Sequence, residues 1–199
     1  MASLLEDDAL TNARPYLVFA AKACVLIAGC LILGTACHEL VGHGLTAVAF
    51  GATITDVQIL GVRVWPSLDF LGWDGRYGAC WWQGDLTESQ SNWALLCGAG
   101  STWLLALLAT ILLWCHRWGV WGRWILTGFS IWWLDVLTYT APSWGLKRSI
   151  LWGGSTSEPY NAAIGLGCPA WAYQSIVILS SLAMAVATAI RLRQLRRKP

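Results

Sequence analysis

Two histidines and a glutamate lie close together in an apolar part of this sequence. The stretch reads Cys37-His38-Glu39-Leu40-Val41-Gly42-His43-Gly44. Burying such side chains in an apolar segment costs free energy unless they are paired or bind a metal. Imidazole nitrogens are common Zn²⁺ ligands, and a neighbouring carboxylate can act as a general base on water. We therefore predict His38 and His43 as metal ligands and Glu39 as the catalytic base.

The spacing of the two histidines sets a condition on the helix that carries them. In the usual HExxH zinc motif the histidines are four residues apart and share one helix face. Here they are five residues apart, which corresponds to about 140° around an ideal α-helix and points the rings in different directions. A π-helical turn brings such a pair back to one face, and Gly42 makes the distortion cheaper. We therefore predict a π-bulge between His38 and His43.

Four apolar segments are predicted to position this motif within a membrane. Of the 199 residues, 56% are hydrophobic and 12% are charged, whereas soluble domains have about 25% charged residues. The 15 Trp residues suit the interface between hydrocarbon and headgroups. The predicted helices cover residues 16–50, 92–114, 120–142 and 170–190, each near or above the ~20 residues that span a bilayer. The expected fold is a single all-α polytopic membrane domain with about four transmembrane helices.

Basic residues near the ends of these segments predict the orientation of the chain. Arg117 lies between the second and third predicted spans, Arg123 lies at the start of the third, and the tail, residues 191–199, is strongly basic. Both regions are expected in the cytoplasm, so four spans place the N-terminal residues 1–15 there as well. The loop 143–169 then lies outside, and so does the segment 51–91.

This outer segment is expected to be rich in β-structure. Thr53–Ile59 and Val62–Trp65 roughly alternate polar and apolar residues and contain β-branched ones, and glycines separate such runs. We predict one or two small β-hairpins at the membrane surface.

The hexapeptide HELVGH resembles the HExxGH zinc motif of the dipeptidyl peptidase III family, in which the same spacing serves a metal site. A broader resemblance is to the site-2 protease (M50) superfamily of intramembrane zinc metalloproteases. It rests on the order of three features: the His/Glu motif in the first long helix, the β-rich stretch, and the run Leu95–Ala106. That run looks like the small-residue AGPxxN-type helix start of the superfamily, although Gly100-Ser101-Thr102-Trp103 replaces its Pro and Asn.

The resemblance implies a third metal ligand from a later helix, usually an aspartate. Asp135 is the acid within the third predicted span. Counting ~1.5 Å of rise per residue places it at about the same membrane depth as His38. Glu158, which precedes the last span, is the alternative third ligand.

The implied reaction is Zn²⁺-dependent hydrolysis of a peptide bond, or another amide, in a membrane-protein or peptide substrate. Glu39 would be the general base, and Tyr139 and Asn161 are candidates to hydrogen-bond the developing oxyanion. The alternative is a non-catalytic membrane protein of the same fold, in which the polar cluster binds metal or supports a partner-binding scaffold. Glu39 distinguishes the two interpretations, since a structural site has no need of it.

Other features of the sequence indicate which partners and contacts to expect. The basic run at the C-terminus follows an apolar helix and lacks interleaved aromatic residues, which favours membrane lipids over a nucleic acid. The seven cysteines include no CxxC pair. Cys80 and Cys168 are both expected on one side of the membrane, which would allow a disulfide between them. Gly98, Gly100 and Ser101 are expected to allow close helix approach.

Overall fold

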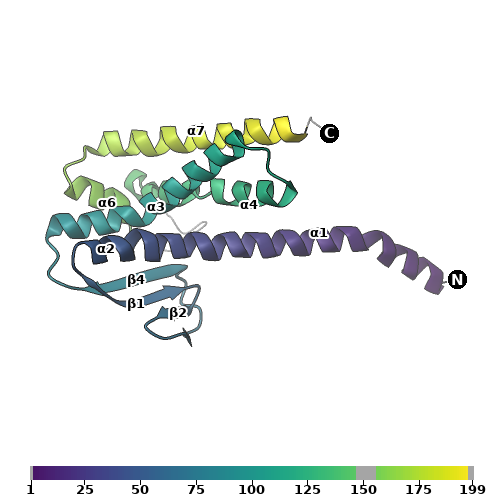
Figure 1. Cartoon of the computed structure of the whole chain (residues 1–199), viewed down its shortest axis with the longest axis horizontal. Coiled ribbons are helices and arrows are strands. Elements are labelled where there is room, and N and C mark those ends of the chain that lie inside the picture. The colour runs from purple at the N-terminus through teal and green to yellow at the C-terminus, as the bar shows by residue number, and fades with distance from the viewer. Residues whose placement is uncertain (1, 147–155, 197–199) are drawn as a thin grey trace.

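Three long apolar helices, crossed by shorter ones and flanked by a small sheet, form the fold (Figure 1). The structure is a computed structural model that describes residues 2–146 and 156–196, with side chains described for residues 18–146 and 156–195. The helices are α1 (Ala2–Ala36), the π-helix η1 (Cys37–Gly44), α2 (Leu45–Ala49), α3 (Glu88–Cys115), α4 (Val120–Ser130), α5 (Trp133–Thr140), the 3-10 helix η2 (Ala141–Trp144), α6 (Glu158–Gly165) and α7 (Ala170–Arg196). The strands are β1 (Thr53–Ile59), β2 (Val62–Trp65), β3 (Asp69–Phe70) and β4 (Gly78–Gln83).

In the described part of the chain, three helical segments are long and apolar enough to cross a membrane. They cover Val18–Ala49, Glu88–Cys115 and Ala170–Leu195. Large apolar side chains on their outer faces are exposed, as Val25 on α1 shows with 74% of its surface accessible. An exposed apolar face of this extent is typical of helices that contact lipid. The chain is thus mostly helical, as the composition predicted.

The remaining predicted span differs from a single long helix. Residues 120–142 form α4 and α5, separated by a break at Ile131 and Trp132. At this break the N–H of Leu134 donates to the carbonyl of Ile131 and the N–H of Asp135 to that of Trp132. These bonds join residues three apart and tighten the backbone. The apolar pattern of the segment therefore did not reveal a helix boundary.

Other element boundaries also differ from those predicted. The first helix begins at Ala2 instead of residue 16, and α3 begins at Glu88, where Thr87 and Gln90 form a reciprocal capping box. Leu95–Ala106, which was expected to start a helix, lies inside α3. The predicted outer loop 143–169 contains α6, while its residues 147–155 lie outside the described part of the chain.

The segment after α2 forms a four-stranded antiparallel sheet with the order β3-β2-β1-β4, which confirms the predicted hairpins. Leu60 and Gly61 connect β1 to β2 with φ angles of 51° and 77°. A two-residue hairpin loop with two positive φ angles suits the twist of the strands, and glycine adopts this conformation without strain. The edge strand β4 packs against η1, so the sheet covers one side of the His/Glu motif.

On the other side, η1 packs closely against α3. A Cβ atom at Gly42 would lie 2.5 Å from the carbonyl oxygen of Cys97 and 2.6 Å from the Cα of Gly98. Glycine at both positions lets the two backbones approach, which confirms the packing role expected for Gly98. Figure 1 shows the resulting layers: the sheet lies on one side of α1 and α2, and α3, α6 and α7 lie on the other.

Candidate metal centre

The helix that carries the two histidines is widened where the spacing predicted. Cys37–Gly44 is π-helical, and the N–H of Leu45 donates to the carbonyl of Leu40, five residues earlier. This wider turn places the rings of His38 and His43 next to each other, with centroids 4.8 Å apart. Both side chains are buried, with residue exposures of 4% and 5%. The predicted π-bulge is confirmed.

One nitrogen of His38 is engaged by a carboxylate. His38 Nδ1 lies 2.7 Å from Asp135 Oδ2, which confirms that the two residues lie at one depth. The hydroxyl of Thr102 lies 2.7 Å from the same oxygen and 2.9 Å from the carbonyl of Ala99. We assign its single proton to the carboxylate, the closer and charged acceptor. Asp135 thus contacts both His38 and Thr102 in a buried position.

The second histidine is also held through its Nδ1 atom, in this case by a backbone carbonyl. His43 Nδ1 donates to the carbonyl of Ala94 on α3, at 2.8 Å. Because a carbonyl can only accept, the proton of a neutral His43 is on Nδ1 and its Nε2 carries the lone pair. Pairing of one ring nitrogen with a carboxylate or carbonyl is the arrangement that orients metal-binding histidines.

The Nε2 atoms of both rings face a small space next to α3. His38 Nε2 is buried and has no hydrogen-bond partner among the residues that the structure describes. A Cβ atom added to Gly98 would meet the His43 ring at Cε1 and Nε2 and would lie 2.8 Å from His38 Nε2. The absence of a side chain at Gly98 therefore leaves room for both rings, whose Nε2 atoms lie close to this position. A buried nitrogen without a partner is costly, and a metal ion would satisfy it.

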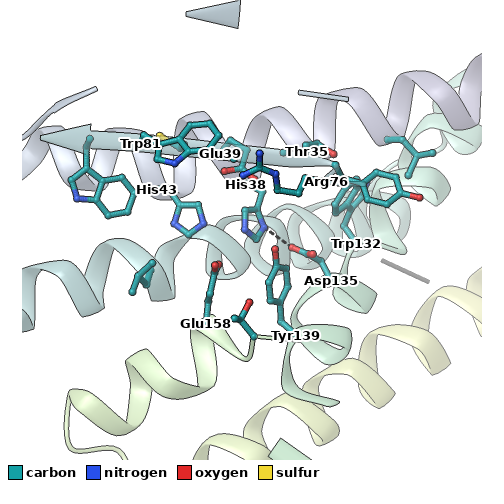
Figure 2. Close-up of a pocket in the computed structure, with 18 residues that line it drawn as sticks. Thr35, His38, Glu39, His43, Arg76, Trp81, Trp132, Asp135, Tyr139 and Glu158 are labelled. Atoms are coloured by element: carbon teal, nitrogen blue, oxygen red, sulfur yellow. Dashed lines mark hydrogen bonds and ion pairs between the residues drawn. The ribbon is translucent and has the colours of Figure 1, made fainter. Parts of the chain in front are cut away.

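A third potential ligand comes from α6. Within the described residues, His38, His43 and Glu158 form a group whose ligand atoms all lie within 4.8 Å of one another. Glu158 is the first residue of α6, and the buried Pro159 follows it. Figure 2 shows its carboxylate pointing towards the two imidazoles. The prediction had favoured Asp135 as the third ligand, whereas in the structure Asp135 contacts the opposite nitrogen of His38 and Glu158 faces the imidazole pair.

Glu39 reaches the same cavity from another side. It is 5% exposed, and a Cβ atom at Gly78 on β4 would lie 2.5 Å from its Oε1 and 2.7 Å from Thr35 Cγ2. Gly78 thus allows the sheet to close over the Glu39 carboxylate. In Figure 2, Glu39 and Glu158 lie on opposite sides of the histidine rings. The arrangement leaves Glu39 beside the cavity without joining the His38, His43 and Glu158 group.

The cavity in front of these side chains has a volume of about 320 Å³ and is lined by α1, η1, β4, α5 and the start of α6. Tyr139 lines it and stacks on His38, with ring centroids 5.3 Å apart. Asn161, the other predicted oxyanion donor, is exposed and does not line it. A volume of this size suits a small ligand or a short segment of a larger one.

Arg76, from the loop before β4, and Cys80, on β4, also line this cavity. Arg76 lines it and is held by Asp74, with Arg76 Nε 2.8 Å from Asp74 Oδ2. These contacts raise the pKa of Arg76 and lower the pKa of Asp74, so both remain charged near neutral pH. Burial, followed by the charges of Glu39 and Asp56, raises the pKa of Cys80 to about 12. Cys80 is therefore a neutral thiol, and it forms no disulfide with Cys168.

Comparison of the chain with models of known families, with curated proteins and with solved structures finds no match. The resemblance to the site-2 protease superfamily therefore rests on the motif and on the order of elements.

Proposed function

We propose that this chain is a membrane-embedded zinc hydrolase of the site-2 protease type that cleaves a peptide or other amide bond. The observation that carries the proposal is the grouping of His38, His43 and Glu158, whose ligand atoms all lie within 4.8 Å of one another in a part of the structure where both histidines are buried. Two imidazoles and one carboxylate are a common ligand set of catalytic zinc sites, which keep a further position open. The donor set therefore fits Zn²⁺.

In this proposal His38, His43 and Glu158 hold the ion, and Asp135 orients His38 from its Nδ1 side. When bound, Zn²⁺ polarises the substrate carbonyl and lowers the pKa of water. Glu39 accepts the proton that water loses as its oxygen adds to the carbonyl carbon, and then donates that proton to the leaving nitrogen. The buried position of Glu39 next to the histidines supports this role.

The proposal includes a membrane topology. The α4–α5 segment would complete a fourth crossing, with both termini in the cytoplasm. The excess of basic residues in the α3–α4 link and in the C-terminal tail supports this orientation. The sheet and the cavity opening would then lie at the outer surface.

Zinc content tests the proposal directly. Elemental analysis of the full chain purified in detergent should find about one Zn²⁺ per molecule, as a three-residue site predicts. His43→Ala should abolish binding, and Glu158→Gln should weaken it by more than about 100-fold, because loss of a ligand exceeds the effect of an outer contact. Competition with a chromogenic chelator measures the affinity.

Glu88→Gln is the matched control, since Glu88 also lies in the first turn of a helix but is exposed on α3. Its zinc affinity should equal that of the wild type. Purified wild-type protein without zinc would refute the proposed function, and unchanged affinity in Glu158→Gln would exclude Glu158 as a ligand.

The Thr102–Asp135–His38 chain leads to a separate prediction. Thr102→Val removes the hydroxyl that lies 2.7 Å from Asp135 Oδ2 while preserving the shape of the side chain. We expect zinc affinity to fall by about 10- to 100-fold, the usual cost of losing an outer-sphere partner. Thr102→Ser keeps the hydroxyl and should retain near wild-type affinity. Equal affinities in the two variants would show that Thr102 has only a packing role.

A further inference from the structure

A second cavity lies beside the candidate metal centre, between α1 and the α4–α5 segment. This apolar groove has a volume of about 340 Å³. Its wall on α1 is formed by Ala23, Leu26, Ile27, Cys30 and Leu31. These positions follow the spacing of a single helix face. The groove is therefore a continuous strip along the part of α1 that is apolar enough to lie in the membrane.

The polar groups of the groove wall are already engaged within the protein. The Thr127 hydroxyl donates to the carbonyl of Arg123 at 2.7 Å, and the Trp132 indole N–H donates to the carbonyl of Cys30 at 3.2 Å. Asp135, at the inner end, contacts His38 and Thr102 through Oδ2. An extended peptide would bury backbone groups here without partners, which costs several kcal/mol per group. The walls instead suit a hydrocarbon chain.

The apolar walls of the groove suit a hydrocarbon chain along its whole length. Such a chain is flexible, makes no hydrogen bonds of its own and can follow the strip along α1.

The inner end of the groove shares lining residues with the cavity that holds the candidate metal centre. Leu31, Trp132 and Asp135 line both cavities. Trp132 is fixed at this junction, because a Cβ atom at Gly34 would overlap its ring and its indole N–H bonds to Cys30. A chain that lies in the groove would thus present its polar end near Asp135, the carboxylate that contacts His38. Figure 2 shows Trp132 close to Asp135.

We propose that the groove binds the hydrocarbon chain of the substrate, and that the bond cleaved is the amide that joins this acyl chain to an amine. This inference rests on the proposed hydrolase function and specifies its substrate class. Water adds its oxygen to the acyl carbonyl carbon and the C–N bond breaks. The nitrogen takes up the proton delivered by Glu39, so that a fatty acid and a free amine result.

Photolabelling tests occupancy independently of catalysis. The probe is N-dodecanoyl-glycine amide with a diazirine at the end of its chain, applied to the full chain in detergent, with cross-links mapped by mass spectrometry. We expect labels on the groove faces of α1 and α4. Ala23→Trp, which fills the groove, should lower labelling at least tenfold. Thr127→Trp should do the same from the opposite wall.

Val25→Trp is the matched control, because Val25 is on the same helix, is 74% exposed and does not line the groove. Its labelling should stay within twofold of the wild type, and all three variants should keep the zinc content of the wild type. Unlabelled N-dodecanoyl-glycine amide should compete for the site, whereas N-acetyl-glycine amide should not. Labelling that is equal in Ala23→Trp and Val25→Trp, or spread over all exposed apolar faces, would overturn the inference and indicate bulk lipid.

Hydrolysis separates this inference from the proposed function. Wild-type protein should cleave N-dodecanoyl-glycine amide with a kcat/KM at least tenfold above that for N-acetyl-glycine amide, and Ala23→Trp should lose this preference. Cleavage of both amides without a preference would overturn the acyl assignment while supporting the hydrolase. Specific labelling with no cleavage of either amide would refute the hydrolase and, with it, the assignment of the acyl amide as substrate.

Discussion

Gly98→Ala is expected to lower zinc affinity by more than about 100-fold, beyond the effect of losing an outer-sphere contact. The added methyl group would overlap the His43 ring at Cε1 and Nε2 and lie 2.8 Å from His38 Nε2. It would therefore push the His43 ring out of its place and crowd the Nε2 atom of His38. Neither ring can easily retreat, because Ala94 holds the Nδ1 of His43 and Asp135 holds that of His38. Chelator competition on the purified chain measures the loss.

Gly100→Ala is the matched control on the same helix, since a Cβ atom there meets nothing within 4 Å. Replacing glycine by alanine inside a helix increases helix stability by roughly 0.5–1 kcal/mol. A loss of zinc binding in Gly98→Ala alone therefore cannot be attributed to a weakened α3. Equal zinc affinity in both variants would show that the ion does not bind between the two Nε2 atoms.

Glu39→Gln should lower the rate of amide hydrolysis by about 10²- to 10⁴-fold, the range expected for loss of a general base. Glutamine has the same shape and can remain packed beneath Gly78, but it cannot take a proton from water. Zinc content should stay at the wild-type level, because Glu39 lies outside the His38, His43 and Glu158 group. The hydrolysis rate is measured as the kcat of the purified chain on an amide substrate. The zinc content is measured by elemental analysis of the same sample.

The combination of results distinguishes catalysis from a structural or carrier role for the ion. Lost hydrolysis with retained zinc identifies Glu39 as the base. Unchanged hydrolysis would exclude it from the reaction, and loss of zinc together with activity would assign Glu39 to the structure of the site. The exposed Glu88→Gln variant should match the wild type in both measurements.

The π-helical turn could be predicted from the sequence because its cause is local. Two rings five residues apart diverge on an α-helix and converge on a π-helix. The depth of Asp135 could also be estimated, since helical rise is constant, and His38 Nδ1 indeed lies 2.7 Å from its carboxylate. Counting residues along a span does not reveal which nitrogen of an imidazole an acid approaches. The depth estimate could therefore not establish whether Asp135 is the third ligand.

Other parts of the candidate site depend on contacts between distant segments. Glu158 faces the histidines because the short helix α6 packs against α3, and its sequence resembled a loop. Gly98 was expected to allow close helix packing, and Thr102 lies one turn further along α3. Their contacts with the Nε2 atoms and with Asp135 depend on how α3 is rotated about its axis. The break between α4 and α5 could not be predicted, because the sequence is apolar on both sides of it.

By itself the sequence determined the apolar helices, the hairpins and the chemical character of the His38–His43 motif, because periodicity, turn residues and helix geometry act over a few neighbours. Only the tertiary structure decided which carboxylate faces the imidazole pair, which atom holds each Nδ1, and that an apolar groove shares lining residues with the metal cavity. These features depend on the rotation and approach of segments up to 120 residues apart, such as His38 and Glu158. Packing of the whole chain, rather than any local preference, sets that geometry.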